Sequence, residues 1–222
     1  MINHDKTKGH IVKLISICKN IIQDAVKLFE EMNKIREYAD FTQDAKDRKT
    51  LEAKTAAKEA RIKYCEELTE IISSVEVAEA ENAAYFDPAD ARILGAAELI
   101  NSIGNAADDK LCESIVKTFK GYYLALRYLK SLFEKNGLST GAIDGVLIDV
   151  NSMAQEFYIL IRNVQNEGET DVASAFNLAN TAIDLADKLG IELSAGEKDL
   201  GMDYGSYLNI VRYPSMGTTA QV

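Results

Sequence analysis

The sequence predicts an all-α protein: an antiparallel bundle of five to six long amphipathic helices with an extended C-terminal tail. The 222 residues include only 2 Pro and 13 Gly, so little interrupts long helices. Hydrophobic residues make up 47% of the chain, which is enough for a substantial core. Apolar residues also recur at alternating spacings of three and four, the period of an amphipathic helix. We therefore expect residues 1–190 to form the bundle and residues 191–222 to form the tail.

The first helix is expected over residues 8–39, where apolar residues form a sustained heptad seam. The seam consists of Ile11, Leu14, Cys18, Ile21, Ala25, Leu28, Met32, Ile35 and Ala39. Ile15, Ile22 and Phe29 widen this stripe on one flank. A stripe of this width suits a bundle core better than a two-stranded coiled coil.

The second helix is expected over residues 42–85, and its two halves differ. Residues 44–63 are rich in Ala, Lys, Glu and Arg, which favour a helix but provide little apolar surface. One interpretation is that residues 42–63 form a helical arm that projects from the bundle or awaits a partner. Apolar residues return from Ile62 onward, so only the second half needs a core.

Four further helices are expected over residues 87–104, 108–136, 139–168 and 170–189. Asp87 followed by Pro88 predicts an N-cap and first helical residue for the earliest of them. Short loops favour antiparallel packing of consecutive helices. The predicted core includes apolar residues of the helices expected over 8–39, 108–136 and 139–168: Ile21, Leu28, Ile115, Phe119, Leu126, Val150, Met153 and Phe157.

The tail has four glycines and no helical period, and residues 207–213 resemble a short strand in composition. A lone strand cannot satisfy its own backbone hydrogen bonds, so a partner chain is expected to supply an edge. The predicted partner-binding residues are Tyr204, Tyr207, Leu208, Ile210, Val211, Arg212 and Tyr213. The alternative is that the tail folds back as a short helix with Tyr204, Leu208 and Val211 on one face.

The charge distribution argues against nucleic acid as a partner, because the formal net charge is -10. Residues 1–63 carry 14 Lys and Arg against 10 Asp and Glu, a net of +4, whereas residues 64–222 carry 11 against 25, a net of -14. The basic region could rest on an acidic surface of this chain or of a neighbouring subunit. The alternative is that both regions are ordinary solvated helix faces.

The sequence indicates no membrane span, because no apolar run approaches the roughly 18 residues that a span requires. The N-terminal segment also lacks the basic and then apolar layout of a secretory signal. We expect a cytoplasmic protein or part of an intracellularly assembled particle. Cys18, Cys65 and Cys112 each fall on an apolar helical face, which favours buried free thiols over disulfides or a metal site.

Catalytic chemistry is poorly supplied, and we predict no catalytic residue, metal ligand or cofactor. The two histidines, His4 and His10, lie in the polar N-terminal segment. Three carboxylate pairs have a spacing that places each pair on one helix face: Glu67 with Glu70, Glu76 with Glu79, and Asp184 with Asp187. All-helical nucleotide pyrophosphohydrolases use paired motifs of this kind, but the second Glu-x-x-Asp element is missing. Solvated surface is the favoured interpretation.

These observations favour a non-enzymatic assembly, adaptor or structural protein that acts through helix faces and its C-terminal tail. It would work in a larger complex, such as a virion or another multi-subunit assembly. The expected partner is a protein, either a second copy or another subunit, without nucleic-acid or membrane contact. The alternative is an all-helical, divalent-metal-dependent hydrolase that uses the helix carboxylates.

Overall fold

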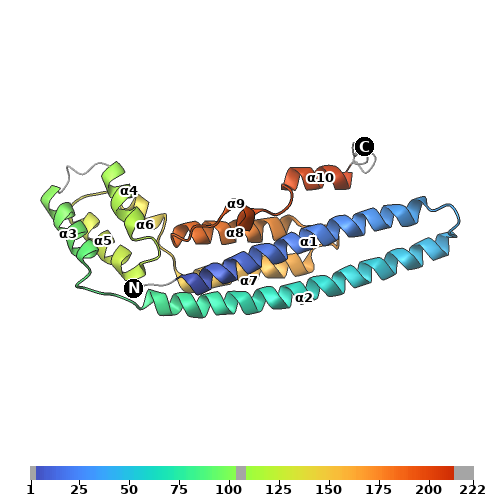
Figure 1. The fold of residues 1–222 in the computed structure, drawn as a ribbon, viewed down its shortest axis with the longest axis horizontal. Helices are drawn as coiled ribbons and strands as arrows, with labels where there is room; N and C mark the ends of the chain where they lie inside the picture. The colour runs from blue at the N-terminus through green and yellow to red at the C-terminus, as the bar shows by residue number, and fades with distance from the viewer. Residues whose placement is uncertain (1–3, 104–108, 213–222) are drawn as a thin grey trace. The chain divides into compact units, whose positions relative to one another are not determined.

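The computed structural model describes residues 4–103 and 109–212, which contain ten helices and no strand (Figure 1). No helix within these residues is both long and apolar enough to cross a membrane. The chain divides into two compact units, which we describe separately. Unit 1 contains Met1–His10, Ser73–Gln155 and Ile183–Leu193, and unit 2 contains Ile11–Ile72, Glu156–Ala182 and Ser194–Val222.

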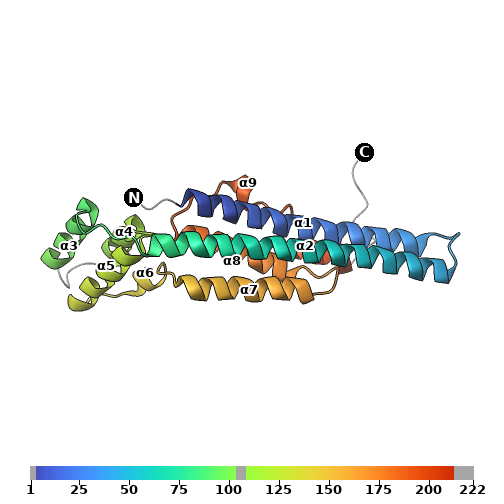
Figure 2. The same cartoon turned by 90° about the horizontal axis from the view of Figure 1, so that it is seen from below.

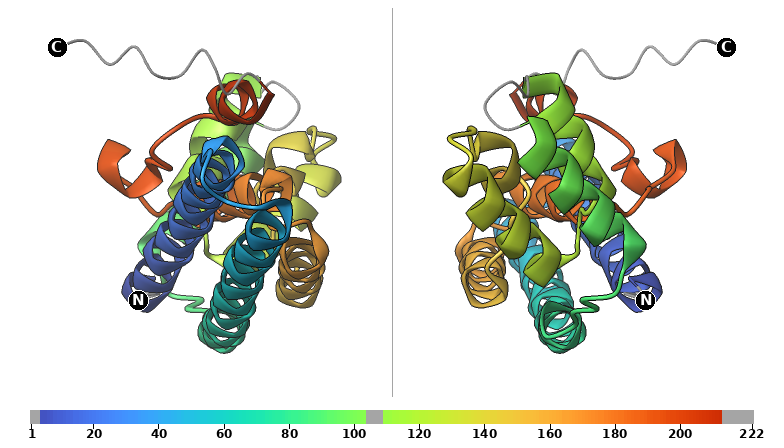
Figure 3. Two further views of the ribbon diagram at one scale, coloured as in Figure 1. Left: turned by 90° about the vertical axis from the view of Figure 1, so that its right-hand side faces the viewer. Right: turned by 90° about the vertical axis from the view of Figure 1, so that its left-hand side faces the viewer.

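Four helices supply most of unit 2: α1 (Asp5–Glu37), α2 (Gln43–Ala83), α7 (Val150–Asn166) and α8 (Ala173–Lys188). Each also contributes one end to unit 1. Figures 1 to 3 show α1 and α2 running side by side through unit 2. The first predicted seam is confirmed as core over most of its length, and its buried members are Ile11, Leu14, Cys18, Ile21, Ala25, Leu28 and Ile35.

The first half of α2 is helical without burying a side chain. No residue from 43 to 60 is buried, and the first buried residue is Arg61, with 6% of its surface exposed. The Nζ atom of Lys46 donates to the carbonyl of Arg36 at 2.7 Å. High intrinsic helix propensity therefore accounts for this stretch better than core packing does. In Figures 1 and 2 the α1–α2 hairpin continues past the ends of α7 and α8 within unit 2.

The buried seam of α2 begins one residue before the expected apolar start at Ile62 and continues to Glu79. Its buried members are Arg61, Cys65, Leu68, Ile72, Val75 and Glu79, which repeat at spacings of three and four. Ile62 is only half-buried, because Arg61 occupies the seam position instead. The first member of the seam is therefore a buried cation, Arg61 in unit 2, and the last is a buried carboxylate, Glu79 in unit 1.

Unit 1 is built around α3 (Ala91–Ile103), α4 (Asp109–Thr118), α5 (Tyr123–Lys135) and α6 (Gly141–Asp144). Its core residues, apart from smaller ones, are Ile93, Ile100, Cys112, Ile115, Val116, Phe119, Tyr122, Leu126, Leu129, Leu132, Phe133 and Ile143. The single helix predicted over 108–136 is wrong, because the chain turns between α4 and α5. Gly121 adopts φ +73° there, a left-handed conformation that ends a helix.

The predicted start of the third helix is also wrong. α3 begins at Ala91, and the Oδ1 atom of Asp90 accepts the N–H of Arg92 at 2.9 Å, as an N-cap does. Asp87 instead accepts the N–H of Ala89 at 2.9 Å and so stabilises a turn before the helix. Pro88 lies in that turn rather than in a helix.

The helix predicted over 139–168 is divided into α6 and α7, and a new cap starts the second part. Asp149 accepts the N–H of Ser152 at 2.8 Å, just before α7 begins at Val150. Val150 is therefore a terminal residue and only half-buried, whereas the other seven predicted core residues are buried.

The extended tail is wrong for the described residues, which form α9 (Ala195–Lys198) and α10 (Tyr204–Arg212). The helical alternative is what the structure shows. A helix satisfies backbone hydrogen bonds within itself, so residues 204–212 need no partner edge. Tyr213, the last predicted strand residue, lies outside the described residues. Two of the six predicted helices are each divided in two, and the described part of the tail adds two more. The described residues therefore contain ten helices rather than five to six.

Candidate functional site

A buried carboxylate, Glu79 at the end of α2, lies at the centre of a polar network in unit 1. None of its surface is exposed, so the predicted solvated position is wrong. Its Oε1 atom accepts from the hydroxyl of Thr7 at 2.5 Å and lies 3.0 Å from Nδ1 of His4. Its Oε2 atom accepts from the hydroxyl of Tyr123 at 2.7 Å, and Asn82 Nδ2 donates to Oε1 at 3.2 Å. The network thus joins the start of α1 to α2 and α5.

The surroundings of Glu79 favour its ionised form. Burial by itself raises the pKa of this carboxyl, but hydrogen bonds from His4, Thr7 and Tyr123 outweigh burial and place the pKa below its ordinary value. Burial, together with the neighbouring charge of Glu79, raises the pKa of Tyr123 far above its ordinary value. Tyr123 therefore stays protonated at neutral pH and acts as a donor to the carboxylate.

The imidazole of His4 packs against the backbone of Gly121. A Cβ atom built on Gly121 would lie 2.4 Å from Nε2 of His4 and 2.7 Å from the carbonyl oxygen of Leu189. With Nδ1 directed at Glu79 and Nε2 at Gly121, the ring is held on both sides. The sequence contains no local signal for this placement, because His4 precedes the apolar seam of α1.

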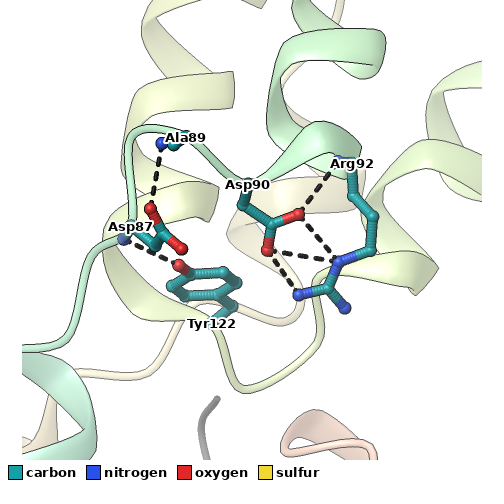
Figure 4. A network of polar contacts seen from close by, with 5 residues as sticks. All are labelled: Asp87, Ala89, Asp90, Arg92 and Tyr122. Carbon is teal, nitrogen blue, oxygen red and sulfur yellow. Dashed lines mark hydrogen bonds and ion pairs between the residues drawn. The ribbon is translucent and has the colours of Figure 1, made fainter.

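A pocket of about 370 Å³ lies beside His4 in unit 1. Its lining combines aromatic, acidic and basic groups: His4, Tyr85, Asp87, Asp90, Arg92, Thr118, Lys120, Gly121 and Tyr122. Figure 4 shows one wall of the pocket, where Asp87 and Asp90 stand on either side of the ring of Tyr122. The main-chain N–H of Asp87 donates to the Tyr122 hydroxyl at 2.9 Å and fixes the turn over the ring.

Most charged groups of the pocket are paired inside unit 1. Arg92 Nη2 lies 2.5 Å from Asp90 Oδ2, and the hydrogen bonds from Arg92 lower the pKa of Asp90 to about 2. Lys120 Nζ lies 2.8 Å from the carboxylate of Asp187. In the part of the chain that the structure describes, Asp87 is the one lining charge without an oppositely charged partner.

Three exposed aromatic side chains, which we call the aromatic patch, adjoin this pocket. Tyr85, Phe86 and Tyr128 are 37%, 39% and 41% exposed. The rings of Phe86 and Tyr128 meet edge to face, with centroids 6.4 Å apart. Tyr85 lies 5.7 Å from the buried ring of Tyr122 and also lines the pocket. Tyr85 therefore belongs to both the patch and the pocket.

The predicted tail site lies in unit 2 and is partly used within the chain. Tyr207 is 2% exposed, and its hydroxyl donates to the carbonyl oxygen of Thr170. Tyr204 meets the ring of Phe176 edge to face at 5.4 Å. Burial raises the pKa of Tyr207 to about 12. Leu208, Ile210 and Val211 are half-buried, so α10 retains apolar surface beyond its own docking contact.

The predicted carboxylate pairs do not converge. Glu67 binds Lys13 at 2.6 Å, Asp187 binds Lys120, and Glu79 belongs to the buried network. In the described ranges, no three His, Cys, Asp or Glu side chains are placed to hold a metal ion. Three cysteines are buried, as predicted, and none of them forms a disulfide bond with another described residue: Cys18, Cys65 and Cys112.

No protein-family model, no curated protein and no solved structure matches the chain. The function therefore has to be inferred from the pocket and the aromatic patch themselves.

Proposed function

We propose that this protein is a non-enzymatic assembly or adaptor protein that binds another protein chain through the pocket and aromatic patch of unit 1. The observation that supports this most directly is the amino-acid composition of the pocket lining and the aromatic patch. Protein interfaces are enriched in Tyr, Phe and Arg, and their energetic centres are anchors that fill pockets on the partner. This surface combines Tyr85, Phe86, Tyr128 and Arg92 around a pocket that is large enough for one side chain.

Pre-organisation is the second support. The Arg92 side chain is 55% exposed, yet its guanidinium is held by Asp90 through Nε at 3.0 Å and Nη2 at 2.5 Å. Ordering a flexible side chain on binding costs about 0.5–1.5 kcal/mol, and a side chain that is already oriented avoids much of that cost. Tyr122 beneath the patch is fixed in the same way by the backbone of Asp87.

The rest of the chain fits the same role. Unit 2 provides what we take to be an antiparallel bundle, and α10 adds a second surface with exposed Tyr204 and half-buried Leu208, Ile210 and Val211. We propose that these tail residues make secondary contacts with the partner, either a second copy or another subunit. Tyr207 is excluded from that role while it is docked inside unit 2.

Photo-cross-linking in cells tests this proposal for either kind of partner. A photoreactive phenylalanine analogue replaces Phe86 in one variant and Tyr128 in a second. Exposed Ile159 of α7, which is 60% exposed and lies in unit 2, provides the matched control position.

We expect one and the same protein, identified by mass spectrometry, to cross-link at both patch positions and not at the control. Phe86→Ser should reduce cross-linking from position 128. Cross-linking at the patch that does not exceed the control would overturn the proposal.

A further inference from the structure

We propose that the pocket of unit 1 receives a lysine side chain of the partner protein and that the carboxylate of Asp87 binds its ammonium group. This inference rests on the proposed function, because it names the anchor that the docking surface accepts. Charge is the first argument. Arg92 is neutralised by Asp90, Lys120 by Asp187, and His4 faces the ionised Glu79. Asp87 is left with a negative charge that no described residue balances.

An anion fits this pocket poorly, because every cation on its lining already faces a carboxylate. A metal ion fits poorly as well, since the described residues provide no three ligand side chains together. An organic cation is the class that complements the remaining charge. A half-buried carboxylate binds such a group more strongly than a fully solvated one does, because screening is weaker there.

The hydrogen-bonding geometry of Asp87 favours lysine over arginine. Its Oδ1 atom already accepts the N–H of Ala89 at 2.9 Å, so Oδ2 is the oxygen that Figure 4 shows without a contact. Arginine gains most from a carboxylate that offers both oxygens to its planar fork. An ammonium group is a compact point charge and needs one strong acceptor plus polar neighbours. The hydroxyls of Tyr122 and Thr118, which also line the pocket, can supply those neighbours.

The aromatic walls suit the rest of a lysine side chain. Tyr85 and Tyr122 lie with ring centroids 5.7 Å apart, and both line the pocket. The four methylene groups of lysine pack against such rings while the charged end reaches the carboxylate. A cation near a tyrosine face gains a further cation–π attraction. Phe86 and Tyr128 outside the pocket would then cover the backbone of the partner beside the inserted lysine.

The test is an NMR titration of the full chain carrying labelled tyrosine rings. The probe is Nα-acetyl-lysine N-methylamide, and its uncharged counterpart is Nα-acetyl-norleucine N-methylamide. We expect saturable shifts of the Tyr85 and Tyr122 resonances with the lysine probe, and binding weaker by roughly tenfold with the norleucine probe. Asp87→Asn, which keeps the acceptor for Ala89, should weaken the lysine probe by a similar factor. Asp109→Asn, at an exposed acid of α4 outside the pocket lining, should leave binding unchanged.

Several outcomes would overturn the inference. Equal binding of the two probes would do so, and so would an unaltered affinity in the Asp87→Asn variant. Much tighter binding of spermidine than of the lysine probe would assign the pocket to a soluble polyamine instead. If Asp87→Asn fails to fold, the wild-type chain still provides the test. Raising the ionic strength to about 1 M should then weaken the lysine probe and not the norleucine probe.

The two proposals fail in distinguishable ways. If cross-linking at position 86 persists undiminished in the Asp87→Asn variant and the lysine probe does not bind, the docking surface stands and the lysine anchor is wrong. If neither patch position cross-links, the docking function and the anchor that depends on it are both overturned.

Discussion

Replacing Tyr123 by Phe removes one hydroxyl from the buried network of unit 1 and leaves the ring in place. That hydroxyl donates to Glu79 Oε2 at 2.7 Å, and both side chains are almost wholly shielded from water, at 2% and 0% exposure. A hydrogen bond to a charged group contributes about 1.5–3 kcal/mol, and the carboxylate would keep no substitute donor on that oxygen. We therefore expect the free energy of unfolding to fall by about 1.5–3 kcal/mol.

The same substitution should weaken the acid sensitivity of the protein. Because its partners lower the pKa of Glu79 in the folded state, the resulting stabilisation is fully present above the unfolded value near 4.5. It is lost as the pH falls through the folded pKa. Tyr123→Phe removes one of the three hydrogen bonds that lower that pKa. The variant should therefore lose less stability than the wild type when the pH is taken below 4.5.

Urea unfolding followed by circular dichroism, at neutral pH and at a pH below 4.5, measures both effects. Tyr128→Phe is the matched control, because Tyr128 is 41% exposed and its ring lies on the surface of the same unit. A surface change of this kind should stay within about 0.5 kcal/mol of the wild type. If Tyr123→Phe is no more destabilising than Tyr128→Phe, the network does not stabilise unit 1 in the way described.

Three further predictions follow from other contacts. Gly121→Ala should destabilise unit 1 by more than Gly137→Ala. Both glycines have positive φ, which costs about 1–2 kcal/mol for alanine, but only at Gly121 would the new methyl group meet His4 and a backbone oxygen; equal losses in thermal unfolding would contradict this. Arg61→Lys should lower the free energy of unfolding in urea by about 1.5–3 kcal/mol, because the Arg61 guanidinium donates to three successive carbonyls after α7. An unchanged free energy of unfolding would refute that role. Tyr207→Ala should release α10 and speed its hydrogen exchange without changing exchange in α8; retained protection would show that other contacts hold the helix.

The periodic pattern was sufficient to predict the helical class and most of the core. Helix α1 matches its predicted seam because three- and four-residue spacings persist along a single uninterrupted segment. The same apolar period does not reveal the break at Gly121. Phe119 and Tyr122 on either side of it are also three residues apart, so the apolar pattern continues through the turn. The glycine itself was the visible signal, but its positive φ is a property of the folded chain.

The candidate site was far less predictable. The partners of Glu79 stand 72 and 44 positions away at Thr7 and Tyr123, and nothing in a single sequence shows that they meet. The tail was misassigned for a related reason. Val, Ile and Tyr favour strands by composition, but the docking of Tyr207 and its hydrogen bond to Thr170 favour a helix that rests on unit 2.

One signal in α2 did point to the buried polar groups. Arg61 and Glu79 occupy the two ends of the seam that continues through Cys65, Leu68, Ile72 and Val75, so each stands where the period requires an apolar residue. A charge in such a position is costly unless it is paired or hydrogen-bonded, and polar residues at seam positions are known to specify register. Arg61 meets backbone carbonyls in unit 2, and Glu79 meets hydroxyl donors in unit 1. A shift of α2 by one heptad would separate Arg61 from its partners in unit 2 and Glu79 from its partners in unit 1, so each charge disfavours such a shift.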